Sequence, residues 1–341
     1  VGAPFFDNGE SDEGAVFVFH GSVNGITAMS VNAADAFIES DQANAEFGQG
    51  LAACGDANGD GFADLLVGAH LYDNGQIDEG AAFVFHGSSG GIVGTSPPTA
   101  ASVIESDQAG SNLGWAVAGI GDSNGDGFAD IAVGAPFFDD GEQDEGVVLV
   151  FNGSSGGVTG SNPSSADTSI HSNQVNELLG QSISSAGDVN GDGYSDLLLG
   201  VPRVPFPRNL DVQFVDDRGG AAFVFHGSST RIAGTALSDA ETTLLPEQTK
   251  GAFGFSVASL GDVNGDGFSD IVIGAPRFDN GEVDEGAAFV FHGSQIGIVG
   301  TTPSTAAAIV ESNQLNGFLG ESVSGIGDIN RDGFHDLVVS V

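Results

Sequence analysis

Hydrophobic positions in this chain form short runs that are separated by glycine-rich polar segments. Runs such as Ala81-Ala-Phe-Val-Phe and Ser256-Val-Ala-Ser-Leu contain β-branched, aromatic and small residues. Glycine and Asn-Gly turns bound these runs, which is typical of β-strands joined by hairpins. No segment sustains the 3.6-residue period of an amphipathic helix. The pattern therefore predicts an all-β protein.

The same series of strands and turns recurs along the chain. A segment of the form Asp-x-Asn-x-Asp-Gly-x-x-Asp begins at Asp56, Asp122, Asp188, Asp262 and Asp328. Successive copies start 66, 66, 74 and 66 residues apart, and the runs between them predict four short strands per unit. A fixed period of this size with four antiparallel strands per unit predicts a β-propeller of four-stranded blades. A linear β-solenoid is the alternative.

We predict a single β-propeller domain that contains five repeat units. The domain covers residues 1-341, and the units, counted by the repeated segment, are 1-66, 67-132, 133-198, 199-272 and 273-338.

The two ends of the sequence are predicted to be complementary partial blades. Residues 1-46 supply the second to fourth strands of a blade, and residues 319-341 supply the first and second strands. The chain is therefore expected to form a closed five-bladed ring or part of a larger ring. The fourth unit also carries eight extra residues within 203–218, which we interpret as a tolerated surface insertion, with a ligand-contacting loop as the alternative.

Each repeated segment, here called an ion loop, has the oxygen ligands of a calcium site. Carboxylate or amide side chains stand at positions 1, 3, 5 and 9, and the glycine at position 6 permits a positive φ. The backbone carbonyl of position 7 adds a further oxygen. Hard oxygen ligands without His or Cys favour Ca²⁺ over zinc or copper. The predicted ligands are Asp56, Asn58, Asp60, Phe62 and Asp64; Asp122, Asn124, Asp126, Phe128 and Asp130; Asp188, Asn190, Asp192, Tyr194 and Asp196; Asp262, Asn264, Asp266, Phe268 and Asp270; and Asp328, Asn330, Asp332, Phe334 and Asp336.

The ion loops differ from a helical EF-hand because strands flank them and no Glu stands at the twelfth position. We therefore expect weak calcium binding, with a dissociation constant of about 10⁻⁴–10⁻³ M. The fifth loop should bind most weakly, because Arg331 replaces the glycine of position 4 and brings a cation close to the site. The alternative is a turn without an ion, which is disfavoured because convergent, unpaired carboxylates repel one another.

Charge narrows the range of partners. The chain has 47 acidic and 7 basic residues, a net charge of -40. Such a charge excludes nucleic acid and disfavours anionic membrane surfaces, and no apolar run is long enough to span a membrane. Five divalent ions would offset only about ten of these charges. We interpret the remaining acidic residues as an aid to solubility. The single cysteine, Cys54, is interpreted as a small buried hydrophobe.

A second acidic region lies between the second and third strands of each unit, in turns that resemble Asp-Asn-Gly-x-x-Asp-Glu-Gly. A four-stranded meander places these turns on the face opposite the ion loops. We interpret them as a solvated acidic surface, and a site for a basic partner or further cations is the alternative. Their acidic residues are Asp7, Glu10, Asp12, Glu13, Asp73, Asp78, Glu79, Asp139, Asp140, Asp144, Glu145, Asp279, Asp284 and Glu285.

The order of motifs resembles a known family. A Phe-Gly or Leu-Gly pair precedes each ion loop, and Gly-Ala-Pro follows at 2–4, 134–136 and 274–276. This series resembles the FG-GAP repeats of integrin α-subunit propellers and their bacterial extracellular relatives, over essentially the whole chain. The resemblance implies that each ion loop joins the first and second strands of a blade, and that rings usually have seven blades.

The resemblance also implies a function. It suggests a secreted or cell-surface module for binding or cell adhesion, with structural Ca²⁺, no catalysis, and a protein or glycan ligand on the face opposite the ion loops. Two alternatives are a structural repeat region of a large surface protein and a non-catalytic propeller attached to a hydrolase domain outside this chain. An enzyme that used the propeller itself would need a unique acid pair or His on the inward strands, whereas the sequence shows repeated positions there.

Overall fold

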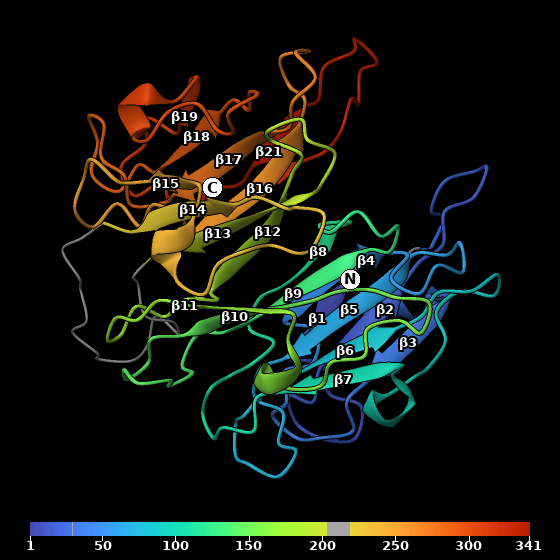
Figure 1. Cartoon of the computed structure of the whole chain (residues 1–341). Helices are drawn as coiled ribbons and strands as arrows, with labels where there is room; N and C mark the ends of the chain where they lie inside the picture. Colours follow the sequence, from blue (N-terminus) through green and yellow to red (C-terminus); the bar gives the residue numbers. More distant parts are fainter. Residues whose placement is uncertain (29, 203–218) are drawn as a thin grey trace.

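The computed structural model describes residues 1–28, 30–202 and 219–341, so the insertion predicted within 203–218 lies outside the described residues. The described strands form antiparallel sheets that follow one another in chain order (Figure 1). Four sheets have four strands each, and the first and last sheets have three and two. The described residues contain no α-helix, only short 3₁₀ turns before the fourth strands. The predicted all-β propeller fold is confirmed.

The first sheet contains β1 (Gly2–Ala3), β2 (Ala15–Val18) and β3 (Ala36–Glu39), and the last contains β20 (Val323–Gly325) and β21 (Leu337–Val339). The second sheet contains β4 (Gly50–Gly55), β5 (Asp64–Ala69), β6 (Ala81–Phe85) and β7 (Ser102–Glu105). The third contains β8 (Val117–Gly121), β9 (Asp130–Ala135), β10 (Val147–Phe151) and β11 (Thr168–His171). The fourth contains β12 (Ser182–Gly187), β13 (Asp196–Val201), β14 (Ala221–Phe225) and β15 (Thr242–Leu244). The fifth contains β16 (Ser256–Gly261), β17 (Asp270–Ala275), β18 (Ala287–Phe291) and β19 (Ala308–Glu311).

The first strands of neighbouring sheets contact one another. β4 lies against β8, β8 against β12, β12 against β16, and β16 against β20. Within each complete sheet the strands pair in sequence order, as four-stranded meanders do. The first strands are therefore the inner strands of the blades, as in a propeller.

The hydrophobic core lies between consecutive sheets. Leu66 and Val84 of one sheet pack in the same buried cluster as Ile131, Val133 and Leu149 of the next. The middle strands β5, β6, β9 and β10 are apolar along nearly their whole length because both faces of each blade are covered by a neighbour. This arrangement fixes each ion loop against the next blade.

The first and last sheets have fewer strands than the other four. β1, β2 and β3 correspond to a second, third and fourth strand, and β20 and β21 to a first and second. Within the described residues, no strand pairing joins β20 or β21 to β1, and the N and C markers stand apart in Figure 1. A closed five-bladed ring and the single-domain boundaries stay predictions.

Candidate functional site

All five ion loops have the same backbone shape. In the loop between β4 and β5, the Asp60 N–H donates to Asp56 Oδ1 (3.0 Å) and to Asn58 Oδ1 (2.9 Å). The Gly61 N–H donates to Asp56 Oδ2 (2.8 Å). The corresponding bonds recur in the loops that begin at Asp122, Asp188, Asp262 and Asp328. The sequence repeat is therefore also a repeat of conformation.

The side chains of positions 1, 3 and 5 are gathered at the tip of each loop. Asp56 and Asn58 accept hydrogen bonds from the same amide, so their oxygens converge, and Asn58 Nδ2 donates to Asp60 Oδ2 (3.1 Å). This set consists of carboxylate and amide oxygens without sulfur or imidazole, which fits a hard cation such as Ca²⁺. The residues predicted at positions 1, 3 and 5 are thus brought together.

The carboxylate of position 9 is held by the backbone instead. Asp64 is 2% exposed, and its oxygens accept hydrogen bonds from the N–H groups of Ala57 (3.0 Å) and Gly87 (2.8 Å). Because Gly87 follows β6, Asp64 links the ion loop to the end of the third strand. Asp130, Asp196 and Asp270 make the same two kinds of bond.

The position-9 residues thus have a structural role that the sequence did not reveal. Their role as ligands stays a prediction. In the described part of the chain, no three or more His, Cys, Asp and Glu side chains are grouped so as to hold a metal.

Burial and backbone amides give the acidic residues of a loop opposite electrostatic environments. Burial, with the nearby charges of Asp192 and Asp188, raises the pKa of Asp196 to about 7. Burial also raises the pKa of Asp64, Asp130 and Asp270. In the fifth loop, hydrogen bonds from backbone amides, first that of Gly333, lower the pKa of Asp328. Backbone amides therefore favour the charged form of the half-buried Asp328 at position 1.

The fifth loop keeps the common backbone despite Arg331. This residue adopts the left-handed conformation (φ 62°) that glycine adopts at position 4 of the first four loops. The predicted weaker binding at the fifth loop stays a prediction.

On the opposite face, each of the four described turns between second and third strands is built around a buried glutamate. Glu145 is fully buried, and its oxygens accept hydrogen bonds from the N–H groups of Asp140 (2.7 Å) and Asn173 (3.0 Å). Its backbone carbonyl accepts a hydrogen bond from the Ser172 hydroxyl (2.8 Å). Glu145 therefore connects its own turn to the segment that follows β11.

The equivalent residues Glu13, Glu79 and Glu285 are at most 1% exposed. The interpretation of these turns as a solvated acidic surface is therefore wrong for the four buried glutamates. At least one carboxylate oxygen of each glutamate accepts a hydrogen bond from a backbone N–H group, so these residues hold the turns together. The signal available in the sequence was their fixed place immediately before a glycine.

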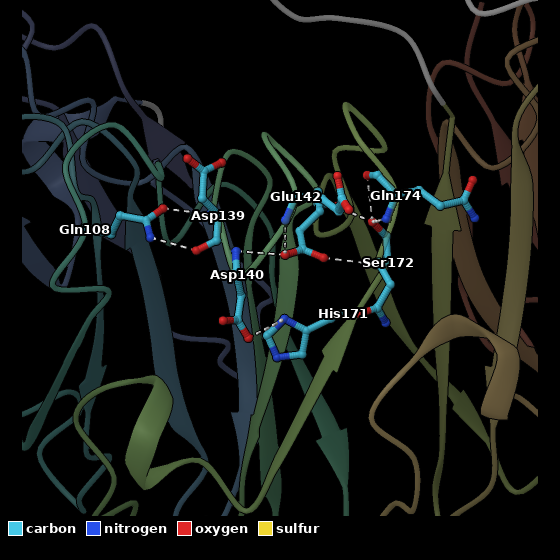
Figure 2. Close-up of polar contacts among 9 residues, drawn as sticks. Gln108, Asp139, Asp140, Glu142, His171, Ser172 and Gln174 are labelled. Carbon is cyan, nitrogen blue, oxygen red and sulfur yellow. Dashed lines mark hydrogen bonds and ion pairs between the residues drawn. The ribbon is translucent and has the colours of Figure 1, made fainter.

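Amide side chains also join neighbouring blades on this face. Gln108 donates through Nε2 to the carbonyl of Asp139 (2.9 Å) and accepts the Asp139 N–H (2.7 Å; Figure 2). Asp139 Oδ1 in turn accepts the N–H of Asp144, whose φ of 49° closes the turn. Gln42 and Asp73 make the same clamp one blade earlier.

The polar pair that joins the turn to the fourth strand differs between the second and third sheets. Asn74 donates to Glu105 in the second sheet, whereas Asp140 and His171 occupy these positions in the third, with His171 Nδ1 3.6 Å from Asp140 Oδ2 (Figure 2). The acidic group has moved from the fourth strand to the turn, and an imidazole replaces the amide as the potential donor. The hydrogen bond of the second sheet is thus replaced by a longer contact, which is an ion pair only when His171 is protonated.

Comparison with known families identifies this architecture. Four segments match the FG-GAP repeat model, at residues 47–85, 113–151, 179–225 and 253–291. Each begins at a Phe-Gly or Leu-Gly pair, includes an ion loop and ends with the third strand of a blade. The chain is an FG-GAP repeat protein.

The relatives of this FG-GAP protein include integrin α-subunits. Integrin alpha-3 of Cricetulus griseus is 35% identical over 174 residues, which are 50% of this chain and 15% of that protein. Integrin alpha-5 of Xenopus laevis is 32% identical over 229 residues, 67% of this chain and 20% of that protein. Integrin alpha-PS2 of Drosophila melanogaster is 30% identical over 232 residues, 67% of this chain and 15% of that protein. The matched region thus spans a fifth or less of the length of these relatives.

The structure explains why the FG-GAP motif needs both of its glycines. A Cβ atom on Gly134, in the Gly-Ala-Pro segment of β9, would lie 2.2 Å from the carbonyl oxygen of Gly180 in the next blade. Gly180 belongs to the following Leu-Gly pair and has a φ of 106°. Blades therefore approach backbone to backbone at this point, which only glycine permits.

Proposed function

We propose that this FG-GAP protein is a calcium-binding extracellular β-propeller that serves as a binding or cell-adhesion module. The observation that carries the proposal is the identical loop geometry, in which oxygens of positions 1, 3 and 5 converge five times. In the second loop, Asp122, Asn124, Asp126 and the carbonyl of Phe128 would hold the ion, and Asp130 would support them. A bound Ca²⁺ supplies positive charge that offsets the repulsion among these groups.

The role proposed for the ion is structural. Each ion loop closes the first hairpin of a blade, so an ion there stabilises the folded form relative to the unfolded chain. Weak loops of this kind suit an extracellular location, where calcium is abundant. The location also rests on the resemblance to integrin α-subunits. No helix among the described residues is long and apolar enough to cross a membrane.

The partner proposed for the module is a protein or glycan that binds the face opposite the ion loops. Exposed acidic side chains such as Glu142 remain there after the buried glutamates are set aside. This surface favours a partner with basic groups, because opposite charges steer association.

A calcium titration tests the ionic part of this proposal. For a site with a dissociation constant of about 10⁻⁴ M, about 10 mM calcium should add roughly 2.7 kcal/mol to the free energy of unfolding. We expect the melting temperature of the intact chain to rise with calcium and to fall after chelation. Asp126→Asn should remove one site from the calorimetric stoichiometry.

Glu142→Gln is the matched control, since it removes one exposed negative charge outside the loops and should leave the stoichiometry unchanged. A melting curve that stays the same after exhaustive chelation would contradict structural calcium. Magnesium at equal concentration measures the contribution of ionic strength and of general divalent binding.

The adhesion part needs a separate measurement. Arrays of matrix proteins and glycans should show calcium-supported binding that weakens when exposed acidic residues of the opposite face are neutralised. The absence of any specific binding would favour a structural repeat region instead.

A further inference from the structure

Asparagine is followed by glycine at ten places in the chain, and the hydrogen bonds of these Asn-Gly pairs differ. In such a pair the backbone nitrogen of glycine can attack the side-chain amide of asparagine, because glycine has no Cβ atom to obstruct the approach. The attack requires a glycine N–H without an acceptor and an asparagine amide that is able to turn. The contacts of each pair therefore indicate whether it can react in the folded protein.

Seven of the ten pairs are restrained by hydrogen bonds. In the second ion loop, the Gly125 N–H donates to Asp122 Oδ1 (2.6 Å), and both ends of the Asn124 amide are bound to Asp126 (2.9 Å each). The same double contact of the side-chain amide recurs at Asn58, Asn190 and Asn264. In the other three restrained pairs the glycine N–H has an acceptor, and these glycines are Gly25, Gly153 and Gly317.

The three remaining pairs lie in the turns between second and third strands, on the face opposite the ion loops. In one of these turns the N–H groups of Asn74 and Gln76 donate to the buried Glu79 (2.8 and 3.1 Å), whereas the Gly75 N–H between them has no acceptor among the described residues. A Cβ atom on Gly75 would meet no atom within 4 Å, so the space around this glycine is open. The N–H groups of Gly9 and Gly281 are likewise without an acceptor in the described chain, and their surroundings are equally open.

We propose that Asn8, Asn74 and Asn280, here called the turn asparagines, are sites of spontaneous deamidation in the folded protein, with water as the only co-reactant. At Asn74, the Gly75 nitrogen loses its proton and forms a bond to Cγ of the asparagine. The bond between Cγ and Nδ2 breaks, and the side-chain nitrogen leaves with that proton as ammonia. One water molecule then opens the cyclic imide to aspartate or isoaspartate, without oxidation or reduction. This proposal does not rest on calcium binding or adhesion.

The reaction changes the contact between each turn and the fourth strand of its blade. The turn asparagines donate hydrogen bonds to the glutamates at the ends of those strands, which are Glu39, Glu105 and Glu311. Deamidation replaces the donor with a carboxylate, and like charges placed opposite each other repel. In the third sheet, where the turn already carries the carboxylate of Asp140, the fourth strand presents His171 and no glutamate (Figure 2). Deamidation should therefore loosen the turns of the other three blades.

Peptide mapping by mass spectrometry of the aged, intact chain tests which asparagines react. In neutral buffer with chelator, we expect each turn asparagine to convert at least about tenfold faster than Asn58, Asn124, Asn190 and Asn264. In urea the two groups should convert at similar rates, because both are Asn-Gly pairs and the restraining hydrogen bonds are lost. Equal rates in the folded chain, or faster conversion in the ion loops, would overturn the proposal. The chelator keeps this result independent of the calcium titration.

Hydrogen exchange tests the effect on the turn. In Asn74→Asp, we expect protection of the Gln76 amide to fall by about twofold to fivefold. The double variant Asn74→Asp/Glu105→His copies the pair of the third sheet and should restore the protection, because no like charges remain. The Glu142 amide, in the corresponding turn of the third sheet, is the internal control and should stay unchanged in both variants. Unchanged protection in Asn74→Asp, or no recovery in the double variant, would contradict the proposed loosening.

Discussion

The two faces of the propeller use acidic residues in opposite ways. On the ion-loop face, Asp56 and its counterparts lie at the loop tips with their oxygens directed toward one another. On the other face, Glu145 and its counterparts are buried, and backbone N–H groups surround them. The first arrangement concentrates negative charge for a cation, and the second uses it to fix backbone turns.

This difference shows that the acidic residues of the chain do not all have the same role. Only residues whose hydrogen-bonding capacity remains open are available to an ion or a partner. The position-9 aspartates of the first four loops stand between the two groups, since they belong to the ion loops but are buried like Glu145. The following predictions test this division, beginning with the largest expected effect.

Removal of a buried glutamate should cost the most stability. In Glu145→Ala, the N–H groups of Asp140 and Asn173 lose their acceptor inside the protein, and a cavity replaces the side chain. We expect the free energy of unfolding to fall by about 3–5 kcal/mol, as measured by urea denaturation. Glu142→Ala removes a charge from an exposed position of the same turn and should change it by less than about 0.5 kcal/mol. Similar values for the two variants would show that the turn is not organised by Glu145.

The sequence predicted the repeated parts of this structure but not the contacts between blades. The period marked by Asp56 and Asp122, with four apolar runs per unit, was sufficient for the propeller, because strand period and turn residues are local signals. The burial of Glu145 escaped prediction because glutamate is normally solvated and its partner Asn173 belongs to a distant segment. Ring closure likewise depends on surfaces that no local pattern describes.

The predicted loop ligands depend partly on local contacts and partly on distant ones, and only the local contacts could be predicted from the sequence. Positions 1, 3 and 5 converge through hydrogen bonds within nine residues, so the motif alone specifies them. The partner of Asp64 at Gly87 is far along the chain, so its structural role became visible only in the fold.

Acid should weaken the fold through a buried histidine on the turn side. His70 follows β5, is 6% exposed and packs 4.7 Å from the Trp115 ring, and burial lowers its pKa from 6.5 to about 4. Glu46 Oε2 lies 3.7 Å from His70 Nε2, but the pKa of Glu46 is itself raised by burial and by Asp12, so burial dominates at His70.

The direction of this pH effect follows from the lowered pKa. The unfolded chain binds the proton more tightly, so the contribution of neutral His70 is complete above pH 6.5 and is lost as pH falls toward 4. The full shift corresponds to at most about 3 kcal/mol. His70→Pro introduces the residue present at the equivalent Pro136 and should flatten the stability curve between pH 6.5 and 4. An unchanged slope in this variant would assign the acid sensitivity to other groups.

The smallest expected loss of stability comes from substitution of a position-9 aspartate. It tests whether these residues bind calcium or only accept hydrogen bonds from the backbone. In Asp130→Asn, an amide NH₂ replaces an oxygen that accepts a hydrogen bond from Ser123 or Gly153. We expect a loss of about 1–3 kcal/mol that is already present in chelator, because the lost bonds do not involve an ion. Asp122→Asn changes the half-buried first position of the loop and should matter mainly when calcium is present. If Asp130→Asn is neutral in chelator and costs stability only with calcium, Asp130 acts as a ligand and its bonds to the backbone are secondary.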